Sequence, residues 1–292
     1  MKDNVVLEVS HLKKYFDLGH GRTLHAVDDV SFSIREGETL GLVGESGCGK
    51  TTCGRTAIGL YSKTDGVSLY RGEDVHRMRG AKRRAFCCQV QTVFQDPYAS
   101  LDPKNKVIDL IAEGMDIHHL YTGPAERREK VQALMEQVGL NPSGIDRYPY
   151  EFSGGMRQRI GIARALAVEP RLLLCDEPIS ALDVSIQAQI VNLLLDLREQ
   201  KSLTYLLISH DLSITKFLQP VRVGGQPGIV HLDWLPAEFL QLPAHQHGAN
   251  GRLPNGSHTF PDHLLRVLRF HFPFPEQILQ FLPALLIQSH GK

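Results

Sequence analysis

The sequence lacks an excess of charge of either sign. Its 32 lysine and arginine residues equal its 32 aspartate and glutamate residues, so the formal net charge is zero at pH 7. Proteins that bind nucleic acid usually carry a basic surface, because their affinity comes largely from phosphate contacts. The densest basic stretch, between Arg71 and Arg84, is typical of a solvated face. The composition therefore predicts no nucleic-acid partner.

Long hydrophobic runs and paired cysteine motifs are also absent. No stretch of 18 apolar residues occurs, and Met1 to Leu12 has no signal-peptide core, so any membrane contact is expected to be peripheral. The cysteines show neither the two-residue spacing of a zinc site nor a disulfide framework. They are Cys48, Cys53, Cys87, Cys88 and Cys175. We expect reduced thiols, as in the cytoplasm.

Strand and helix patterns alternate from the first residue to about residue 218. The full chain of 292 residues, 42% of them apolar, is long enough to bury a sizeable core. Strands are predicted at Val5–Val9, Ser31–Ile34, Thr39–Val43, Val90–Phe94, Leu172–Cys175 and Thr204–Ser209. Helices are predicted at Lys50–Leu60, Ala125–Val138, Gly154–Val168 and Ser185–Glu199. This alternation indicates a layered α/β fold.

A glycine-rich segment, GLVGESGCGKTT at residues 41–52, follows one of these strands. Its glycines let the backbone close around phosphate oxygens at a helix start, where unpaired N–H groups and the helix dipole favour anions. Lys50 is expected to reach the β- and γ-phosphates, and Thr51 to bind Mg²⁺. The predicted nucleotide-binding residues are Gly44, Glu45, Ser46, Gly47, Cys48, Gly49, Lys50, Thr51 and Thr52.

A second nucleotide element is the apolar strand at residues 172–175, which ends in Asp176 and Glu177. A carboxylate at a buried strand end can hold the Mg²⁺ shell beside Thr51, and the next one can orient and deprotonate a water molecule. We therefore predict Asp176 as a metal ligand and Glu177 as the general base.

A further glycine-led helix start lies at residues 152–166, FSGGMRQRIGIARAL. Ser153, Gly154 and Gly155 stand where a helix N-terminus can bind an anion. The chain already has a phosphate loop, so this second start is interpreted as serving the nucleotide of another subunit.

The order of the phosphate loop, Gln95, the SGG helix, the Asp-Glu strand end, Ser-Ala-Leu-Asp and His210 resembles the ATP-binding cassette family. The resemblance implies a P-loop domain with a mainly parallel core sheet, an antiparallel β-subdomain and a small helical subdomain. It also implies a head-to-tail pair of cassettes, with ATP between the phosphate loop of one and the SGG helix of the other.

The same resemblance assigns roles to further residues. Gln95 is expected to contact Mg²⁺ and water, Asp183 to line the dimer seam, and His210 to contact the γ-phosphate. Phe16, or Tyr15 in its place, is expected to stack on adenine. The expected metal set is therefore Thr51, Gln95 and Asp176, and the expected catalytic set is Glu177, His210 and Gln95.

Two longer segments narrow the resemblance. VFQDPYASLDP at residues 93–103 and CDEPISALDVSIQAQ at 175–189 are similar to ATPase subunits of bacterial oligopeptide, dipeptide and nickel importers. This implies an ATPase on the cytoplasmic face of the plasma membrane, working with a second cassette, identical or paralogous, two permease subunits and, indirectly, a substrate-binding protein. Residues 96–150 would form the helical subdomain. Phe152 and Met156 depart from the usual Leu-Ser-Gly-Gly-Gln, and methionine cannot replace the hydrogen bonds of a glutamine amide.

The composition changes at residue 219. The last 74 residues hold nine of the 16 prolines and seven of the 14 histidines. We interpret 1–218 as the ATPase domain and 219–292 as an atypical segment. It arises either from a reading-frame shift near Leu218 to Pro220 or as an appendage. Such an appendage could be a histidine-rich metal segment with His245 and His247, or an amphipathic stretch at 264–282.

Two other functions remain open at this point. One is a soluble cassette that clamps nucleic acid, and the other is an inactive product whose altered tail leaves the core sheet incomplete.

Overall fold

The computed structural model describes residues 4–211, 215, 229–232 and 240–241. The chain divides into two compact units, residues 1–16 with 24–240 and residues 17–23 with 241–292. The strands are β1 (Val5–Asp17), β2 (Thr23–Arg35), β3 (Thr39–Val43), β4 (Asp65–Tyr70), β5 (Glu73–Asp74), β6 (Val90–Val93), β7 (Leu172–Asp176), β8 (Thr204–Ser209), β9 (Ile229–His231) and β10 (Leu240–Gln241). The helices are α1 (Lys50–Ala57), α2 (Gly80–Gln89), α3 (Val107–His118), α4 (Pro124–Gln137), α5 (Gly154–Leu166) and α6 (Val184–Lys201), with 3₁₀ turns η1 (Pro142–Gly144) and η2 (Pro149–Glu151).

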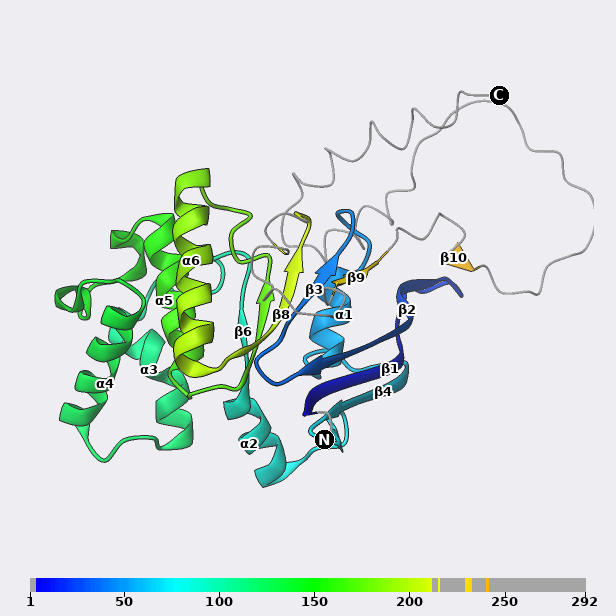
Figure 1. Ribbon diagram of the computed structural model, residues 1–292, viewed down its shortest axis with the longest axis horizontal. Helices are drawn as coiled ribbons and strands as arrows, with labels where there is room; N and C mark the ends of the chain where they lie inside the picture. Colours follow the sequence, from blue (N-terminus) through cyan, green and yellow to red (C-terminus); the bar gives the residue numbers. More distant parts are fainter. Residues whose placement is uncertain (1–3, 212–214, 216–228, 233–239, 242–292) are drawn as a thin grey trace, which may run out of the picture. The chain divides into compact units, whose positions relative to one another are not determined.

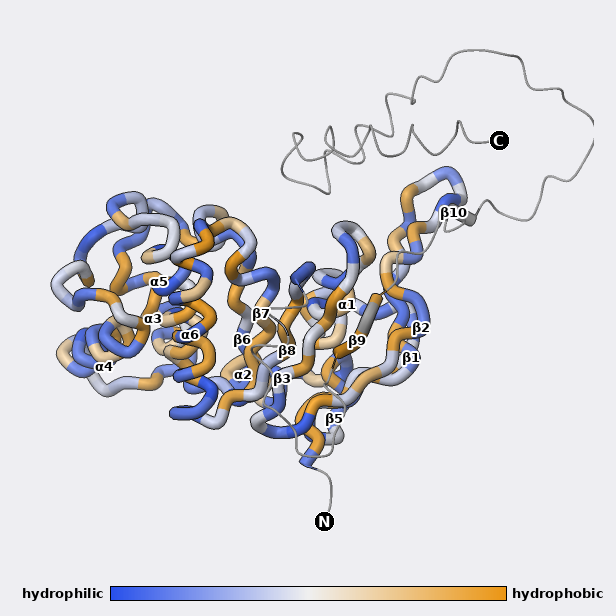
Figure 2. The backbone as a smooth tube through the Cα atoms, turned by 45° about the horizontal axis from the view of Figure 1, so that its top comes forward, coloured by the Kyte–Doolittle hydropathy of each residue, from blue (hydrophilic) through white to orange (hydrophobic). Residues whose placement is uncertain are grey.

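A parallel sheet of order β6-β7-β8-β3-β9 forms the centre of the first unit (Figure 1). Every residue of β3, β7 and β8 is buried. Strands covered on both faces read as continuous apolar runs, which is why the sequence predicted these three so closely. Apolar segments accordingly run through the sheet in Figure 2, and hydrophilic ones lie mainly outside it.

The two faces of this sheet belong to different hydrophobic clusters. Leu172 and Leu174 of β7 join the cluster that contains α1 and the antiparallel strands, whereas Leu173 and Cys175 join the cluster of α3, α4, α5 and α6. The alternation follows from the two-residue period of a strand. Burial also raises the pKa of the Cys175 thiol to about 12, so this cysteine stays a protonated core residue.

The antiparallel sheet has the order β2-β1-β4-β5 within the first unit. Val6, Leu7, Val9 and Leu12 of β1 are buried, whereas Glu8 and His11 between them are exposed. The sequence predicted only the first part of β1 and the last part of β2. It did not predict β4, because charged and polar residues interrupt the apolar pattern at residues 10–30 and 62–74.

The helices α3 to α6 lie together at the β6 side of the sheet in Figure 1, and they share one hydrophobic cluster. The helices predicted at Ala125–Val138, Gly154–Val168 and Ser185–Glu199 match α4, α5 and α6 closely. Residues 71–84 were interpreted only as a solvated face, so the helix α2 was not predicted. Helix α3 lies within the helical subdomain expected at 96–150, but no helix was predicted at its own position.

Part of the segment after residue 218 enters the core sheet. In β9, Ile229, Val230 and His231 pair in parallel with Gly41, Leu42 and Val43. The β9 strand therefore completes the edge of the sheet next to the phosphate-loop strand. The expected metal and amphipathic elements at His245, His247 and 264–282 lie outside the described residues. The boundary expected at residue 218 stays a prediction.

In the described part of the chain, no helix is both long enough and apolar enough to cross a membrane.

Candidate functional site

The predicted site residues gather at one edge of the parallel sheet. Gly44 follows β3, Gln95 comes two residues after β6, Asp176 ends β7 and His210 follows β8. Parallel strands share the edge at which their carboxyl ends lie, and ligands bind there in open α/β sheets. Gly44 and His210, which are 166 positions apart in the sequence, thus lie at the same edge of the sheet.

The phosphate loop has a backbone that requires glycine. Gly47 and Gly49 have φ of 86° and 92°, the region that side chains rarely adopt. A Cβ atom at Gly49 would lie 2.0 Å from the carbonyl oxygen of Ala26, whereas one at Gly47 would meet nothing within 4 Å. The loop is therefore packed against β2 at Gly49 and open at Gly47, as a phosphate cradle must be.

Lys50, the first residue of α1, lies under this loop with only 4% of its surface exposed. Its ammonium donates to the carbonyl oxygens of Gly44 at 2.9 Å and Glu45 at 2.6 Å. Among the described residues no carboxylate forms an ion pair with Lys50. A buried cation held only by neutral acceptors is suited to an anionic ligand, so the loop fits a triphosphate.

Thr51 and Asp176 meet as the sequence predicted. The Thr51 hydroxyl donates to Oδ1 of Asp176 at 2.7 Å, and the Asp176 side chain is fully buried. A hydroxyl and a carboxylate oxygen are ligands that suit Mg²⁺. Arg55 donates to the other oxygen, Oδ2, through Nε at 3.2 Å and Nη2 at 2.9 Å.

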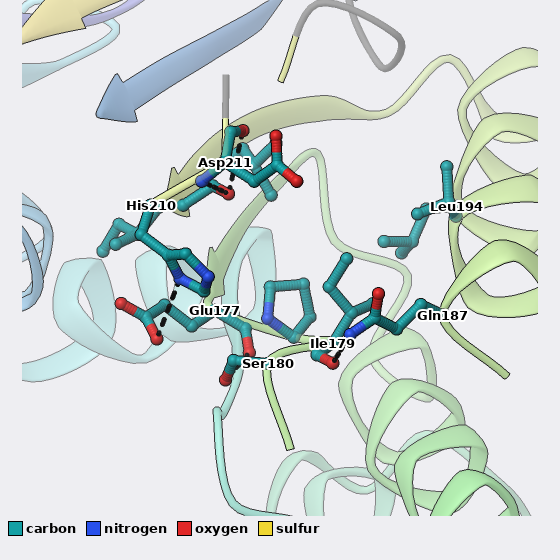
Figure 3. A pocket seen from close by; sticks show the side chains of 12 residues that line it. Glu177, Ile179, Ser180, Gln187, Leu194, His210 and Asp211 are labelled. Carbon is teal, nitrogen blue, oxygen red and sulfur yellow. Dashed lines mark hydrogen bonds and ion pairs between the residues drawn. The ribbon is translucent and has the colours of Figure 1, made fainter. Parts of the chain in front are cut away.

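A second cluster surrounds Glu177 (Figure 3). Gln95 Nε2 donates to Glu177 Oε2 at 2.9 Å and to the Ser180 hydroxyl at 3.3 Å. The imidazole of His210 points toward the same carboxylate, with Nδ1 3.9 Å from Oε2. The three predicted catalytic residues thus lie together, beside a cavity of about 60 Å³ lined by Glu177, Ser180, His210 and apolar residues of α6 and β8.

Glu177 also has a strained backbone. Its φ is 45°, a left-handed conformation that costs a non-glycine residue about 1–3 kcal/mol. Two backbone hydrogen bonds maintain this conformation: Glu177 N donates to the carbonyl of Ile208 at 3.1 Å, and Ser180 N donates to the carbonyl of Glu177 at 3.2 Å. These two hydrogen bonds fix the backbone that carries the Glu177 carboxylate.

At the SGG helix start, Ser153 is exposed, Gly154 is half-buried and Gly155 is buried. Ser153 is the N-cap of α5, and its hydroxyl accepts from the backbone N–H of Met156 at 3.4 Å. Phe152 is 7% exposed within the helical cluster, so it fills the core position expected of leucine. Met156 is 38% exposed, so its side chain lies at the surface.

Asp183 is the N-cap of α6 and is exposed, but its side chain makes no capping hydrogen bond. Within the described part of the chain, no hydrogen bond or ion pair joins Ser153 or Asp183 to the phosphate loop. Gln95, Glu177 and His210 thus contact one another at the sheet edge that carries the phosphate loop, and among the described residues no such bond links Ser153 or Asp183 to that loop.

The two aromatic candidates for adenine differ in their contacts. Tyr15 stacks on His25 with ring centroids 3.8 Å apart, and its hydroxyl donates to Asp28. Burial, with help from Asp28, raises the pKa of Tyr15 to about 12. Phe16 is half-buried against Tyr61 in an edge-to-face contact at 6.3 Å. Of the two rings, Phe16 is the one less committed to internal contacts.

Sequence reasoning missed Arg55 and Ser180. Arg55 follows Thr51 by four residues, the spacing that puts two side chains on the same helix face, so helical periodicity could have indicated it. Ser180 follows Glu177 by three residues in a turn, and only the structure shows that its hydroxyl contacts Gln95.

Comparison with known proteins agrees with this geometry. The sequence profile of the ABC transporter family matches residues 27–180. The chain is 57% identical over 242 residues to the oligopeptide transport ATP-binding protein OppF of Bacillus subtilis, covering 82% of this chain and 79% of that protein. It is 50% identical over 221 residues to the dipeptide transport ATP-binding protein DppF of Lactococcus lactis subsp. cremoris, covering 75% and 70%. Among solved structures it resembles the ATP-binding cassette MJ0796, a dimer bound to ADP and Pi, with a TM-score of 0.66, 25% identity and coverage of 77% and 94%.

The fold and the phosphate loop define an α/β nucleotide-binding domain of the P-loop class. The family match and the identity to transport ATP-binding proteins then fix its place within that class. The chain belongs to the ABC transporter family, and it is an ATPase of the cassette type.

Proposed function

We propose that this chain is the ATP-hydrolysing subunit of a bacterial importer for oligopeptides or dipeptides, in which ATP-driven pairing of cassettes is coupled to substrate translocation. The names of the relatives supply the substrate class, since OppF carries the words oligopeptide transport and DppF the words dipeptide transport. The observation that carries the proposal is the cluster of Gln95, Glu177 and His210 beside the phosphate loop.

The chain's own residues would divide the chemistry as follows. Lys50, already buried at the loop, neutralises charge on the transferred phosphoryl group. Glu177 orients a water molecule and accepts its proton, while Gln95 holds the carboxylate in place from the β6 side. His210, 60% exposed, contacts the γ-phosphate from β8.

Bound Mg²⁺ would neutralise charge on the β- and γ-phosphate oxygens. The oxygens of Thr51 and Asp176, 2.7 Å apart, supply a donor set that fits it. Gln95 belongs to the same proposed set, and its side chain is directed at Glu177 and Ser180.

Among the described residues, no hydrogen bond or ion pair links Ser153 or Asp183 to the phosphate loop of the same chain, which supports a two-cassette arrangement. Both residues are exposed at helix starts, and Val184 beside Asp183 is 81% exposed. In the proposed dimer, Ser153, Gly154 and Gly155 of one cassette bind the nucleotide held by the other, and Asp183 lines the seam. The partner is a second cassette, identical or paralogous.

The importer further requires two permease subunits, and a binding protein that delivers the peptide to them. The cassette would then lie at the cytoplasmic face of the plasma membrane, held there by the permease subunits.

Turnover of the Glu177→Gln variant tests the proposal. General-base catalysis contributes about 10²–10⁴-fold, so ATP hydrolysis should fall by at least about a hundredfold while ATP binding persists. The matched control is Glu199→Gln, which makes the same change at an exposed position of α6 and should leave turnover unaltered. Equal turnover of wild type and the Glu177 variant would contradict the proposed base.

The nucleic-acid clamp and the inactive product are not favoured. The relatives reported above are transport proteins, and the chain has no net positive charge. The β9 strand pairs with β3, so the altered tail does not leave that edge of the sheet bare.

A further inference from the structure

We propose that Arg55 is a positioning residue for the Mg²⁺ site: it holds the Asp176 carboxylate in one orientation, so that one oxygen, Oδ1, remains beside Thr51 for the cation. The inference rests on the proposed function, since it concerns the same nucleotide site.

The first argument is the division of the two carboxylate oxygens. Both guanidinium contacts of Arg55, at 3.2 and 2.9 Å, go to Oδ2 of Asp176, whereas Oδ1 contacts only the Thr51 hydroxyl among the hydrogen bonds of the described residues. A rigid guanidinium that grips one oxygen through two N–H groups fixes the rotation of the carboxylate about its Cβ–Cγ bond. The oxygen next to the phosphate-loop helix is thus kept available.

The second argument is burial. The Asp176 side chain is fully buried and that of Arg55 is 27% exposed, so the pair lies largely out of water. A carboxylate in such a place needs hydrogen-bond partners, and removal of Arg55 would leave Oδ2 without the two N–H groups that hold it. Without Arg55, the Asp176 carboxylate would be free to turn, and the turn would move Oδ1 away from its place beside Thr51.

The third argument is that Arg55 itself is held from several sides. Its Nη1 donates to the Tyr61 hydroxyl at 3.2 Å, and its Cζ lies 5.9 Å from the ring centre of Phe94. These contacts fix the guanidinium independently of Asp176. Arg55 therefore acts as a preformed support for the carboxylate rather than as a side chain that merely follows it.

The test uses thermal unfolding of the full chain with the nonhydrolysable nucleotide AMP-PNP, in EDTA and across a Mg²⁺ titration. Loss of a residue that orients a metal ligand typically weakens metal affinity 10–100-fold. Arg55→Gln should therefore shift the Mg²⁺ concentration for half-maximal stabilisation upward by about tenfold or more, and leave the stabilisation by AMP-PNP in EDTA unaltered. Arg55→Lys keeps the charge without the two-pronged contact and should give a smaller shift.

Two controls separate positioning from a general structural effect. Arg128→Gln removes a surface pair with Asp146 and should leave the Mg²⁺ response unaltered. In an Asp176→Asn background, Arg55→Gln should produce no further shift, because Arg55 acts through that carboxylate. If Arg55→Gln does not fold, the Arg55→Lys response decides the matter.

An Arg55 variant with the wild-type Mg²⁺ response would overturn this inference alone, as would an equal shift in the Asp176→Asn background. Failure of wild type to respond to AMP-PNP at any Mg²⁺ concentration would instead overturn the proposed function, and this inference with it.

Discussion

Alanine substitutions at two adjacent glycines, at the start of α5, should have different effects: one should reduce stability and the other should reduce catalysis. A Cβ atom at Gly155 would lie 2.5 Å from Cγ2 of Ile186 on α6, closer than real contacts allow. A Cβ atom at Gly154 would meet Leu182 and Tyr98 at 3.7 Å, which is ordinary contact. Alanine is therefore expected to be strained at position 155 and accommodated without strain at position 154.

The size of the difference follows from the packing. Ile186 is β-branched and half-buried, so its side chain cannot turn away freely, and overpacking of this kind costs about 1–3 kcal/mol. Alanine favours a helix over glycine by up to about 1 kcal/mol, but this gain is common to both variants. Gly155→Ala should thus be about 1–3 kcal/mol less stable than Gly154→Ala.

Urea unfolding without nucleotide measures this difference, and ATP turnover measures the functional effect. Gly154→Ala should keep wild-type stability or gain slightly, yet lose turnover by at least tenfold, because Gly154 belongs to the helix start that is proposed to bind the partner's nucleotide. The reasoning would be refuted if Gly154→Ala were the less stable variant, or if it were fully active.

Further predictions concern the adenine ring and acid stability. Phe16→Ala should weaken ATP binding by about fivefold, since stacking on an aromatic ring is worth about 1 kcal/mol. Tyr15→Phe loses the hydroxyl's hydrogen bond and should leave the ATP affinity unaltered. Isothermal titration calorimetry measures both affinities, and a larger loss for Tyr15→Phe than for Phe16→Ala would contradict this assignment. Arg127 holds the pKa of Asp116 below its usual value near 3.8, so this carboxylate contributes stability above that pH and loses it as the pH falls below it. Urea midpoints measured from pH 5 downward should decline less steeply for Asp116→Asn than for wild type, and equal slopes would show that the pair does not contribute.

The nucleotide-binding elements could be predicted because their chemistry is local. The phosphate loop needs glycine where φ is positive, and β7 is continuously apolar because both of its faces are buried. The buried parallel strands β3, β7 and β8 and the helices α4, α5 and α6 follow from such patterns. The helix α2 and strand β4 could not be predicted in the same way, because their polar residues owe their conformation to neighbours distant in the chain.

The sequence by itself determined which side chains could bind phosphate, Mg²⁺ and water, since residue type and order along the chain fix those chemical capacities. Only the tertiary structure decided that Gln95, Glu177 and Ser180 touch one another, that Arg55 grips Asp176, and that residues 229–231 supply an edge strand to the sheet. These contacts join residues far apart in the sequence, or depend on side-chain direction, and both are set by how the strands align within one sheet rather than by any local pattern.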